Sequence, residues 1–232
     1  MKGKIVFEDL GLMDYQAAWD YQAKLFDERV NVKLQNRMNP DQSPLYPDNR
    51  LLFVEHPHVY TLGRSGDQNN LLIDQSFLDR IQATYYHIDR GGDITYHGPG
   101  QIVGYPIFDL EQFGIHIRQY VYNLEESIIL TLRDYGIEAG RLEGATGVWL
   151  ETGTPRARKI CAIGVKASRH ITMHGFAFNV NTNLEYFRYI NPCGFLDKGV
   201  TSMEQELGAR QEMSEVKNRL QRVLTGLFSS LL

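Results

Sequence analysis

The sequence predicts a single α+β domain, residues 1–232, in which a mixed or antiparallel sheet is flanked by helices. Amphipathic patterns with helical spacing cover 14–34, 116–135 and the last twenty residues. Three strand-like runs, 146–151, 158–168 and 174–181, follow one another with short turns, which is typical of an antiparallel meander. Because the strands gather in groups and no Rossmann or phosphate-loop motif is present, a doubly wound nucleotide-binding fold loses its usual support.

The remaining elements are expected mostly in the first half of the chain. We expect strands at 4–8, 51–56, 84–89 and 101–110, a short helix at 76–82 and a long surface loop at 35–50. Pro106 lacks a backbone N–H, so it points to an edge position or a bulge in its strand. Gly136 follows the helix at 116–135 as a stop signal.

Composition excludes several classes of protein. Hydrophobic residues make up 43% of the 232 residues and charged residues 22%, as in an ordinary globular protein with a full core. The net charge of −4 and the lack of a basic block argue against nucleic acid as a partner. No secretory signal pattern and no apolar run of membrane-spanning length is present, and two cysteines make no disulfide framework. We therefore expect a cytoplasmic protein without a membrane span.

The stretch 90–106 is the densest unusual segment, with five glycines and two prolines beside charged and imidazole side chains. Glycines let a backbone approach a ligand and point N–H groups at it. Arg90 is able to pair with an acid, and His97 to move protons. The alternative is an irregular connection whose glycines only make turns.

Histidines offer further candidates. His56 and His58 flank a proline and would supply two metal ligands, but no third ligand recurs at a recognisable spacing, so we expect no metal. His174 opens a strand-like run in which Gly175 and Ala177 are small enough to leave room beside it. A satisfied structural histidine remains the alternative.

The two cysteines have different surroundings. Cys161 stands in an apolar run, whereas Cys193 lies between Pro192 and Gly194, which indicates a tight turn able to hold a sulfur in a cleft. A turn cysteine without chemistry is the alternative. A nucleophilic thiol needs a cationic or basic neighbour, because its ordinary pKa leaves it mostly protonated at neutral pH. From the residues alone, His97 and His174 are the default partners, and the lysines 159, 166 and 198 are less expected.

Four motifs together resemble one family. EHPHVYTLGR, RGGDITYHGPGQIVGYPIFDL, KICAIGVKASRHITMHGFAFNVN and INPCG, in this order over about residues 50–207, are similar to the lipoyl(octanoyl) transferases of lipoate biosynthesis. The resemblance implies the fold of biotin and lipoate-protein ligases, with no cofactor. It implies transfer of an octanoyl group from octanoyl-acyl carrier protein to a lysine of apo lipoyl domains, the first step of endogenous protein lipoylation.

The resemblance also assigns roles to residues. Cys193 matches the cysteine that carries the acyl thioester, and Lys159 matches the lysine that lowers the pKa of that thiol, which replaces the histidine default. The positions implied for acyl binding are Arg90, Gly91, Gly92, Asp93, Ile94, Thr95, Tyr96, His97, Ala162, Ile163, Gly164, Gly175, Phe176 and Ala177, with His56 and His174 as further pocket candidates. Strand alternation would place Cys161 on the same face as Lys159.

Three alternative functions are compatible with some of these features. An ATP-dependent lipoate or biotin ligase of the same fold needs no nucleophilic cysteine, so the NPCG motif counts against it. A cysteine-dependent thioesterase would pass the acyl group to water. A non-catalytic acyl-binding module would have no reason to pair Cys193 with Lys159.

Overall fold

A large mixed sheet forms the centre of the computed structural model, which describes residues 3–191 and 199–232. Within these residues its strand order is β1-β2-β6-β10-β9-β8-β7, with the short β11 beside β9. The strands are β1 (Ile5–Leu12), β2 (Asn49–Glu55), β6 (Gln101–Ile107), β7 (Gly140–Leu142), β8 (Ala145–Leu150), β9 (Arg158–Ser168), β10 (Ile171–Asn179) and β11 (Gly199–Val200). A smaller sheet, of order β4-β3-β5, is made of β3 (Val59–Leu62), β4 (Thr84–His87) and β5 (Ile94–His97).

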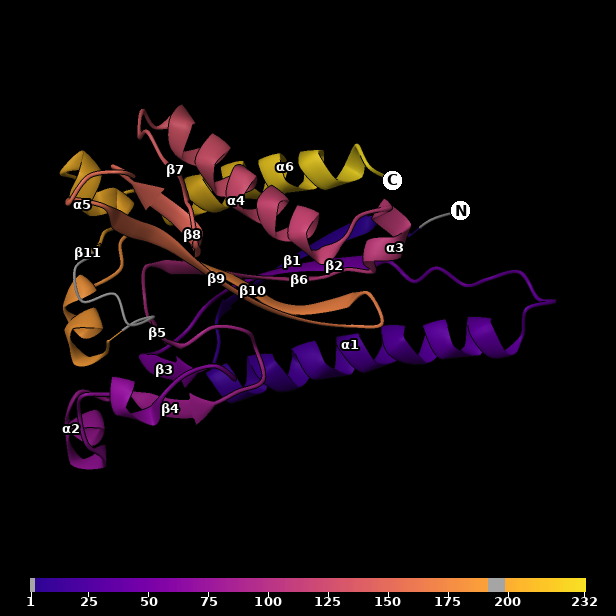
Figure 1. Ribbon diagram of the computed structural model, residues 1–232, viewed down its shortest axis with the longest axis horizontal. Coiled ribbons are helices and arrows are strands. Elements are labelled where there is room, and N and C mark those ends of the chain that lie inside the picture. The colour runs from indigo at the N-terminus through magenta and orange to yellow at the C-terminus, as the bar shows by residue number, and fades with distance from the viewer. Residues whose placement is uncertain (1–2, 192–198) are drawn as a thin grey trace.

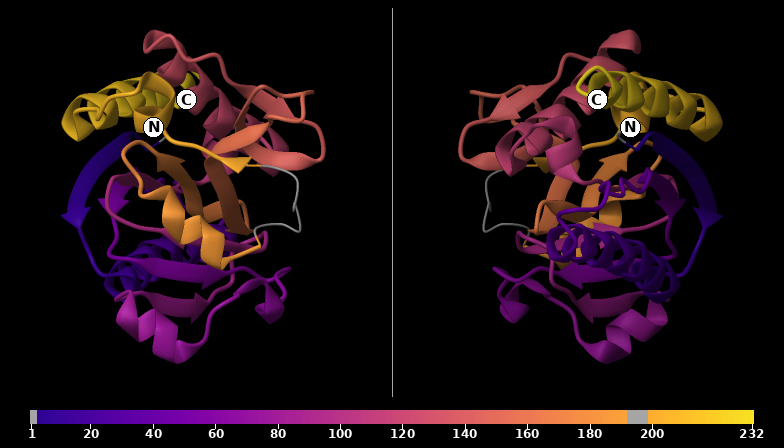
Figure 2. Two further views of the ribbon diagram at one scale, coloured as in Figure 1. Left: turned by 90° about the vertical axis from the view of Figure 1, so that its left-hand side faces the viewer. Right: turned by 90° about the vertical axis from the view of Figure 1, so that its right-hand side faces the viewer.

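Helices cover the two faces of the large sheet (Figure 1). On one face lie α4 (Ile117–Asp134) and α6 (Met213–Ser229), which pack on each other and share a core cluster with β9 and β10. On the other face, α1 (Tyr15–Met38) packs across β10 and β6 through Ala18, Leu25 and Phe26. Figure 2 shows the same layers end-on, with the strands between the two helical layers. The single α+β domain with a mixed sheet is confirmed.

Short helices complete the connections. They are α2 (Gln75–Arg80), α3 (Leu110–Phe113) and α5 (Met203–Leu207), with 3₁₀ turns η1 (Gln68–Asn70) and η2 (Leu184–Tyr189). Within the described part of the chain, no helix has the length and apolar character that crossing a bilayer requires.

The predictions of the long helices and of the antiparallel meander are confirmed. The periodic stripe of α4 buries Leu124, Ile128 and Leu132, and β8, β9 and β10 pair antiparallel in succession. The first helix runs to Met38, so the expected loop at 35–50 is shorter than predicted.

Two local predictions had different outcomes. β6 is a central strand that pairs with both β2 and β10, but Pro106 itself pairs only with Leu51 of β2, so the predicted edge position is correct locally. The proline is tolerated because the ladder to β10 stops at Gly104, and beyond it the Thr172 hydroxyl donates to the Pro106 carbonyl (2.8 Å). For the glycine-rich segment, the alternative of one irregular connection is wrong, since strand β5 lies inside the segment and pairs with β3.

Candidate active site

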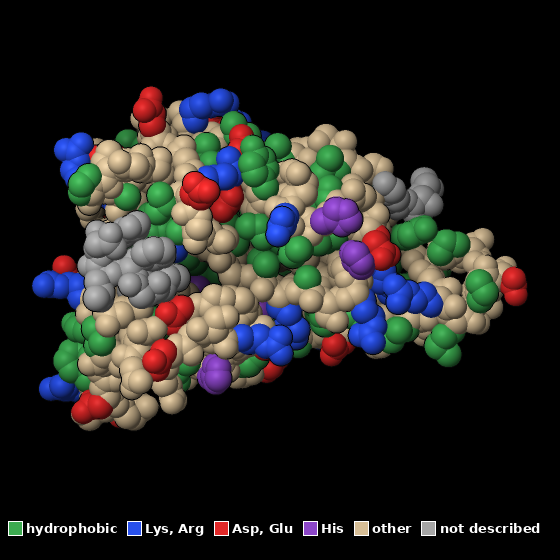
Figure 3. Space-filling view, in the orientation of Figure 1, with side chains coloured by type: hydrophobic (Ala, Val, Ile, Leu, Met, Phe, Trp, Pro, Cys, Tyr) green, Lys and Arg blue, Asp and Glu red, His purple; other side chains and the backbone are tan. Residues whose placement is uncertain are grey.

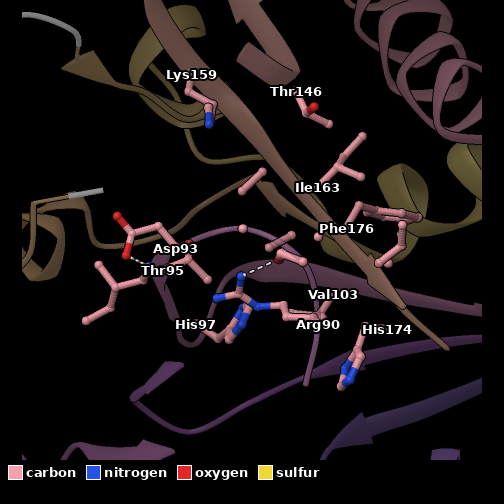
Figure 4. Close-up of a pocket in the computed structure, with 18 of the residues that line it drawn as sticks. Arg90, Asp93, Thr95, His97, Val103, Thr146, Lys159, Ile163, His174 and Phe176 are labelled. Atoms are coloured by element: carbon pink, nitrogen blue, oxygen red, sulfur yellow. Dashed lines mark hydrogen bonds between the residues drawn. The ribbon is translucent and has the colours of Figure 1, made fainter. Parts of the chain in front are cut away.

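A cavity of about 470 Å³ opens between the glycine-rich segment and the middle of the large sheet. Lys159 and His174 lie at opposite ends of it, with Ile163 and Phe176 between them and Arg90 and His97 across from the sheet (Figure 4). Its size is in the range of small-molecule sites. The predicted residues that line it are Arg90, Gly91, Gly92, Asp93, Ile94, Thr95, His97, Lys159, Ala162, Ile163, Gly164, His174, Gly175, Phe176 and Ala177.

Two predicted pocket residues do not line the cavity. Tyr96 is fully buried and directs its ring away, stacking on Tyr186 with its hydroxyl hydrogen-bonded to His58 Nδ1 (2.7 Å). His56 lies behind the wall, where its Nδ1 donates to the Met13 carbonyl (2.9 Å) and its Nε2 accepts from the Tyr105 hydroxyl (2.8 Å). Burial lowers the pKa of His56 to about 4, so it is neutral and structural. Cys193 lies outside the described residues.

The wall opposite the sheet is fixed by Arg90. Its guanidinium is buried and donates to the Thr61 carbonyl (2.6 Å), the Thr61 hydroxyl (3.0 Å) and the Gly91 carbonyl (3.0 Å). The backbone of the same segment is tied to β9, because the Gly91 N–H donates to the Val165 carbonyl (2.9 Å). Through these three hydrogen bonds, Arg90 holds the glycine-rich wall of the cavity in place.

His97 belongs to a buried polar chain under the cavity. Its Nδ1 donates to Gln101 Oε1 (2.9 Å), because the Gln101 amide nitrogen is used on Asn179 Oδ1 (2.9 Å). Complete burial holds the pKa of His97 well below its usual range, so the ring is neutral. Its Nε2 then accepts the Thr61 hydroxyl (3.3 Å). The chain continues from the Asn179 amide to the Thr201 carbonyl (3.0 Å).

Lys159 is placed by its neighbours on the sheet. Its carbonyl accepts the Thr201 N–H (2.9 Å), and Val200 of β11 pairs beside it. Its side-chain nitrogen lies 4.6 Å from the centre of the Trp149 ring on β8. An aromatic face attracts an ammonium group at this distance. The end of the cavity at Lys159 therefore combines a cationic side chain with an aromatic wall.

The Cys161 side chain does not line the cavity as that of Lys159 does. Strand alternation had predicted that both would lie on one face. On β8, the adjacent Val148 and Trp149 pair with Cys161 and Lys159, so β9 carries one extra residue at Ile160. Such a bulge interrupts the alternation of side chains. Cys161 is fully buried in the main core, and burial raises the pKa of its thiol far above its usual range. The thiol is thus a packing group.

A charged cluster closes the other end of the cavity. His174 Nε2 donates to Asp89 Oδ1 (3.0 Å), and the Lys166 ammonium pairs with Asp89 Oδ2. The hydrogen bond from His174, together with Lys166, holds the pKa of Asp89 well below its usual range, while burial lowers that of His174. His174 has a left-handed backbone (φ 60°) in the middle of β10, which costs of order 1 kcal/mol or more.

Glycines on paired strands line the middle of the cavity. Gly164 of β9 pairs with Gly175 of β10. A Cβ at Gly164 would lie 2.8 Å from the Gly91 carbonyl oxygen, and one at Gly175 would lie 2.1 Å from the Gly104 carbonyl oxygen. Both positions therefore need glycine, because backbone rather than flexible side chain approaches them.

Several lining residues were missed from the sequence. Those on α1, β6 and β8 include Tyr15, Val103, Tyr105, Thr146 and Trp149. The run TGVWL on a predicted strand beside the Lys159 motif was the one signal able to reveal Trp149. Residues 3–191 and 199–232 contain no cluster of three or more His, Cys, Asp or Glu side chains able to hold a metal ion.

The profile of the lipoyl protein ligase A/B catalytic domain matches residues 14–225. A curated relative from Cytophaga hutchinsonii, named octanoyltransferase, is 57% identical over 225 residues, 97% of this chain and 92% of its own.

Solved structures share the fold at low identity. A bipartite lipoate protein ligase from Thermoplasma acidophilum superposes with a TM-score of 0.67 at 16% identity, covering 99% of this chain and 84% of that one. A biotin protein ligase from Aquifex aeolicus gives 0.53 at 11% identity, covering 98% and 71%.

The fold is thus the one that lipoate and biotin protein ligases share. The chain belongs to the lipoyl protein ligase A/B catalytic domain family and, within it, to the lipoyl(octanoyl) transferases. The sequence-based assignment of family and enzyme class is confirmed.

Proposed function

We propose that this enzyme transfers an octanoyl group from octanoyl-acyl carrier protein to a lysine of apo lipoyl domains, such as those of 2-oxoacid dehydrogenase E2 subunits and the glycine cleavage H protein. The acyl group passes through a thioester on Cys193. Lys159 activates the thiol and then serves as acid and base. No ATP is consumed, because the donor thioester already carries the free energy that making an amide needs.

In the first half-reaction the Cys193 thiolate attacks the carbonyl carbon of the donor thioester. A new carbon–sulfur bond forms and the bond to the carrier's thiol breaks. That sulfur leaves as a thiolate, which takes a proton from the Lys159 ammonium group and leaves Lys159 neutral. The exchange replaces one thioester by another and is nearly neutral in free energy. A nearby ammonium group favours the attacking thiolate over the thiol.

In the second half-reaction the amine of the acceptor lysine attacks the Cys193 thioester. The amine loses a proton, the carbon–nitrogen bond forms, and the carbon–sulfur bond to Cys193 breaks to regenerate the thiolate. Lys159, which is neutral after the first half-reaction, is the proposed acceptor of that proton, and it returns to the ammonium form.

The observation that carries the proposal is the position of Lys159 at one end of a cavity whose middle is apolar. Ile163, Phe176 and Val103 line the part beyond the lysine, which suits an alkyl chain. Gly199, the first described residue after 192–198, also lines the cavity. On the face of the molecule that Figure 3 shows, basic and acidic side chains are interspersed.

Intact mass spectrometry in two stages tests the proposal. Incubation with octanoyl-acyl carrier protein without ATP is expected to add one octanoyl group to the enzyme, and addition of apo lipoyl domain is expected to move it to that domain. Loss of the adduct to water would instead favour a thioesterase. No adduct would favour an ATP-dependent ligase or a binding module.

The two cysteines provide a matched pair of variants. Cys193→Ala is expected to abolish the adduct, and Cys161→Ala to retain it, because the Cys161 thiol is buried in the core. An adduct on the Cys193→Ala protein would contradict the proposed nucleophile.

A further inference from the structure

The contact between Lys159 and Trp149 is built into the pairing of β8 and β9. The two residues are direct cross-strand partners, and the lysine nitrogen lies 4.6 Å from the centre of the indole ring. The bulge at Ile160 follows immediately along β9. Because a bulge redirects the side chains next to it, the pairing register sets the direction of Lys159.

The indole ring itself is held in one orientation. Trp149 is 2% exposed, and its ring N–H donates to the Ala145 carbonyl (2.9 Å) at the start of the same strand. A buried ring with its N–H satisfied has little freedom to turn. It therefore presents a fixed π face to the ammonium group.

Gly147 lets strand β8 approach the backbone of β9 beside the lysine. A Cβ at this position would lie 3.5 Å from Lys159 Cε and 2.5 Å from the Cys161 carbonyl oxygen, and the backbone has φ 121°. The Gly147 N–H donates to Glu125 Oε1 (3.0 Å), and Arg141 Nε holds the other oxygen of that carboxylate (2.9 Å). Strand β8 is thus anchored to α4 at the point where Lys159 passes it.

We propose that Trp149 is a positioning residue for the octanoyl transfer, holding Lys159 over its ring as an ammonium group at the end of the cavity. The inference rests on the proposed role of Lys159. A ring face stabilises the charged form of the side chain relative to the neutral amine, and it restricts a long, flexible chain to one direction. Both effects strengthen the cationic environment that a reactive thiol requires.

Alkylation of Cys193 by iodoacetamide as a function of pH tests this directly, since it measures thiolate formation without either protein substrate. Peptide mass identifies which cysteine reacts. In Trp149→Leu the acid limb of the profile is expected to move up by about half a pH unit, with a smaller shift in Trp149→Phe, because without the indole ring the ammonium group is no longer held in one direction beside the thiol. Octanoylation at pH 7 should slow by about three- to tenfold in Trp149→Leu.

A double-mutant cycle separates positioning from damage to the fold. In a Lys159→Met background the Trp149→Leu change is expected to cause no further shift, because the lysine through which the ring acts is gone. Phe26→Leu is the matched control, since Phe26 lies under a different lysine, Lys166, with 5.0 Å from nitrogen to ring centre. This control should leave the profile in place.

The outcomes distinguish the two proposals. An unchanged profile in Trp149→Leu, beside a shifted one in Lys159→Met, would overturn the positioning role alone. An equal shift from Trp149→Leu with and without Lys159 would also overturn it. An unchanged profile in Lys159→Met would remove the proposed role of Lys159, and the inference with it.

Discussion

The two ends of strand β9 carry a lysine over an aromatic ring, but in different surroundings. Near its start, Lys159 lies over Trp149 and lines the cavity. Toward its end, Lys166 lies over Phe26 and pairs with Asp89, which also accepts a hydrogen bond from His174. The charge of Lys166 is used inside a structural cluster, whereas that of Lys159 faces the space proposed for substrate. We therefore propose that the lysine at one end of the strand serves stability and the lysine at the other end serves the chemistry.

Substitution of each lysine by alanine should show the difference between the two ends of β9 most clearly. Lys159→Ala is expected to slow octanoyl transfer by about 10²- to 10⁴-fold, the usual contribution of a positioned acid–base group. Lys166→Ala should reduce it less than about tenfold, because its partner Asp89 lies behind the cavity wall. Rates of domain octanoylation by mass spectrometry provide the measurement, and similar losses in the two variants would contradict the assignment.

The glycines in the middle of β9 and β10 should show the next largest effect, on stability. Gly175→Ala places a Cβ 2.1 Å from the Gly104 carbonyl oxygen and 2.7 Å from Pro106 Cδ. Overpacking of this kind typically costs about 1–3 kcal/mol. Urea denaturation should show a lower midpoint for this variant. Gly226→Ala, on helix α6 with nothing within 4 Å of the added Cβ, should be neutral or stabilising, and equal midpoints for the two variants would argue against close packing at Gly175.

Acid should weaken the cluster at the Lys166 end. Since the pKa of Asp89 is depressed in the folded protein, its carboxylate stabilises the fold above the ordinary aspartate pKa near 4, and that contribution is lost as the pH falls through the folded pKa. Asp89→Asn is expected to cost about 1 kcal/mol at pH 7, a modest value because the side chain is 37% exposed and screened by water.

The cost of Asp89→Asn should shrink as the pH is lowered from about 4 toward 2, because the Asp89 carboxylate of the unfolded parent protein binds a proton in this range while that of the folded protein stays ionised. Urea unfolding at several pH values measures it. A cost that stayed constant with pH would show that the aspartate acts by shape rather than by charge.

The smallest expected effect concerns the turn that follows β9. Arg169 and His170 both have left-handed backbones (φ 49° and 65°) in a two-residue hairpin connection, where glycine or asparagine is preferred. His170→Gly should stabilise the protein by up to about 1 kcal/mol through relief of this strain. The contact of His170 with Glu111 (3.5 Å) joins two half-exposed side chains and offsets little of the gain. A lower urea midpoint would contradict this.

Periodicity was sufficient to predict the elements that make the frame of the fold. The α4 stripe and the β8-β9-β10 meander carry their pattern in the sequence, because each buries a regular set of side chains. The role proposed for Lys159 came from a family motif, since no spacing rule connects residue 159 with residue 193. Before that motif was recognised, the histidines at 97 and 174 were the expected partners, but His97 is a neutral, fully hydrogen-bonded group and His174 is paired with Asp89.

The details of the cavity were harder to predict because they depend on local irregularities. The bulge at Ile160 separates Lys159 from Cys161, although alternation places them together. Tyr96 and His56 belong to motifs that line the cavity, yet their side chains turn into other clusters. Trp149 went unnoticed because a buried aromatic residue on a strand is usually only core.

The most direct test of the account is the site of acylation. Digestion of the enzyme after exposure to octanoyl-acyl carrier protein, without ATP, is expected to give one octanoylated peptide that contains Cys193, with the Cys161 peptide unmodified. The amount formed in a short incubation should fall strongly in Lys159→Ala. An octanoyl group on any other residue, or undiminished labelling of Lys159→Ala, would contradict the central claim that a lysine-activated thiol carries the acyl chain.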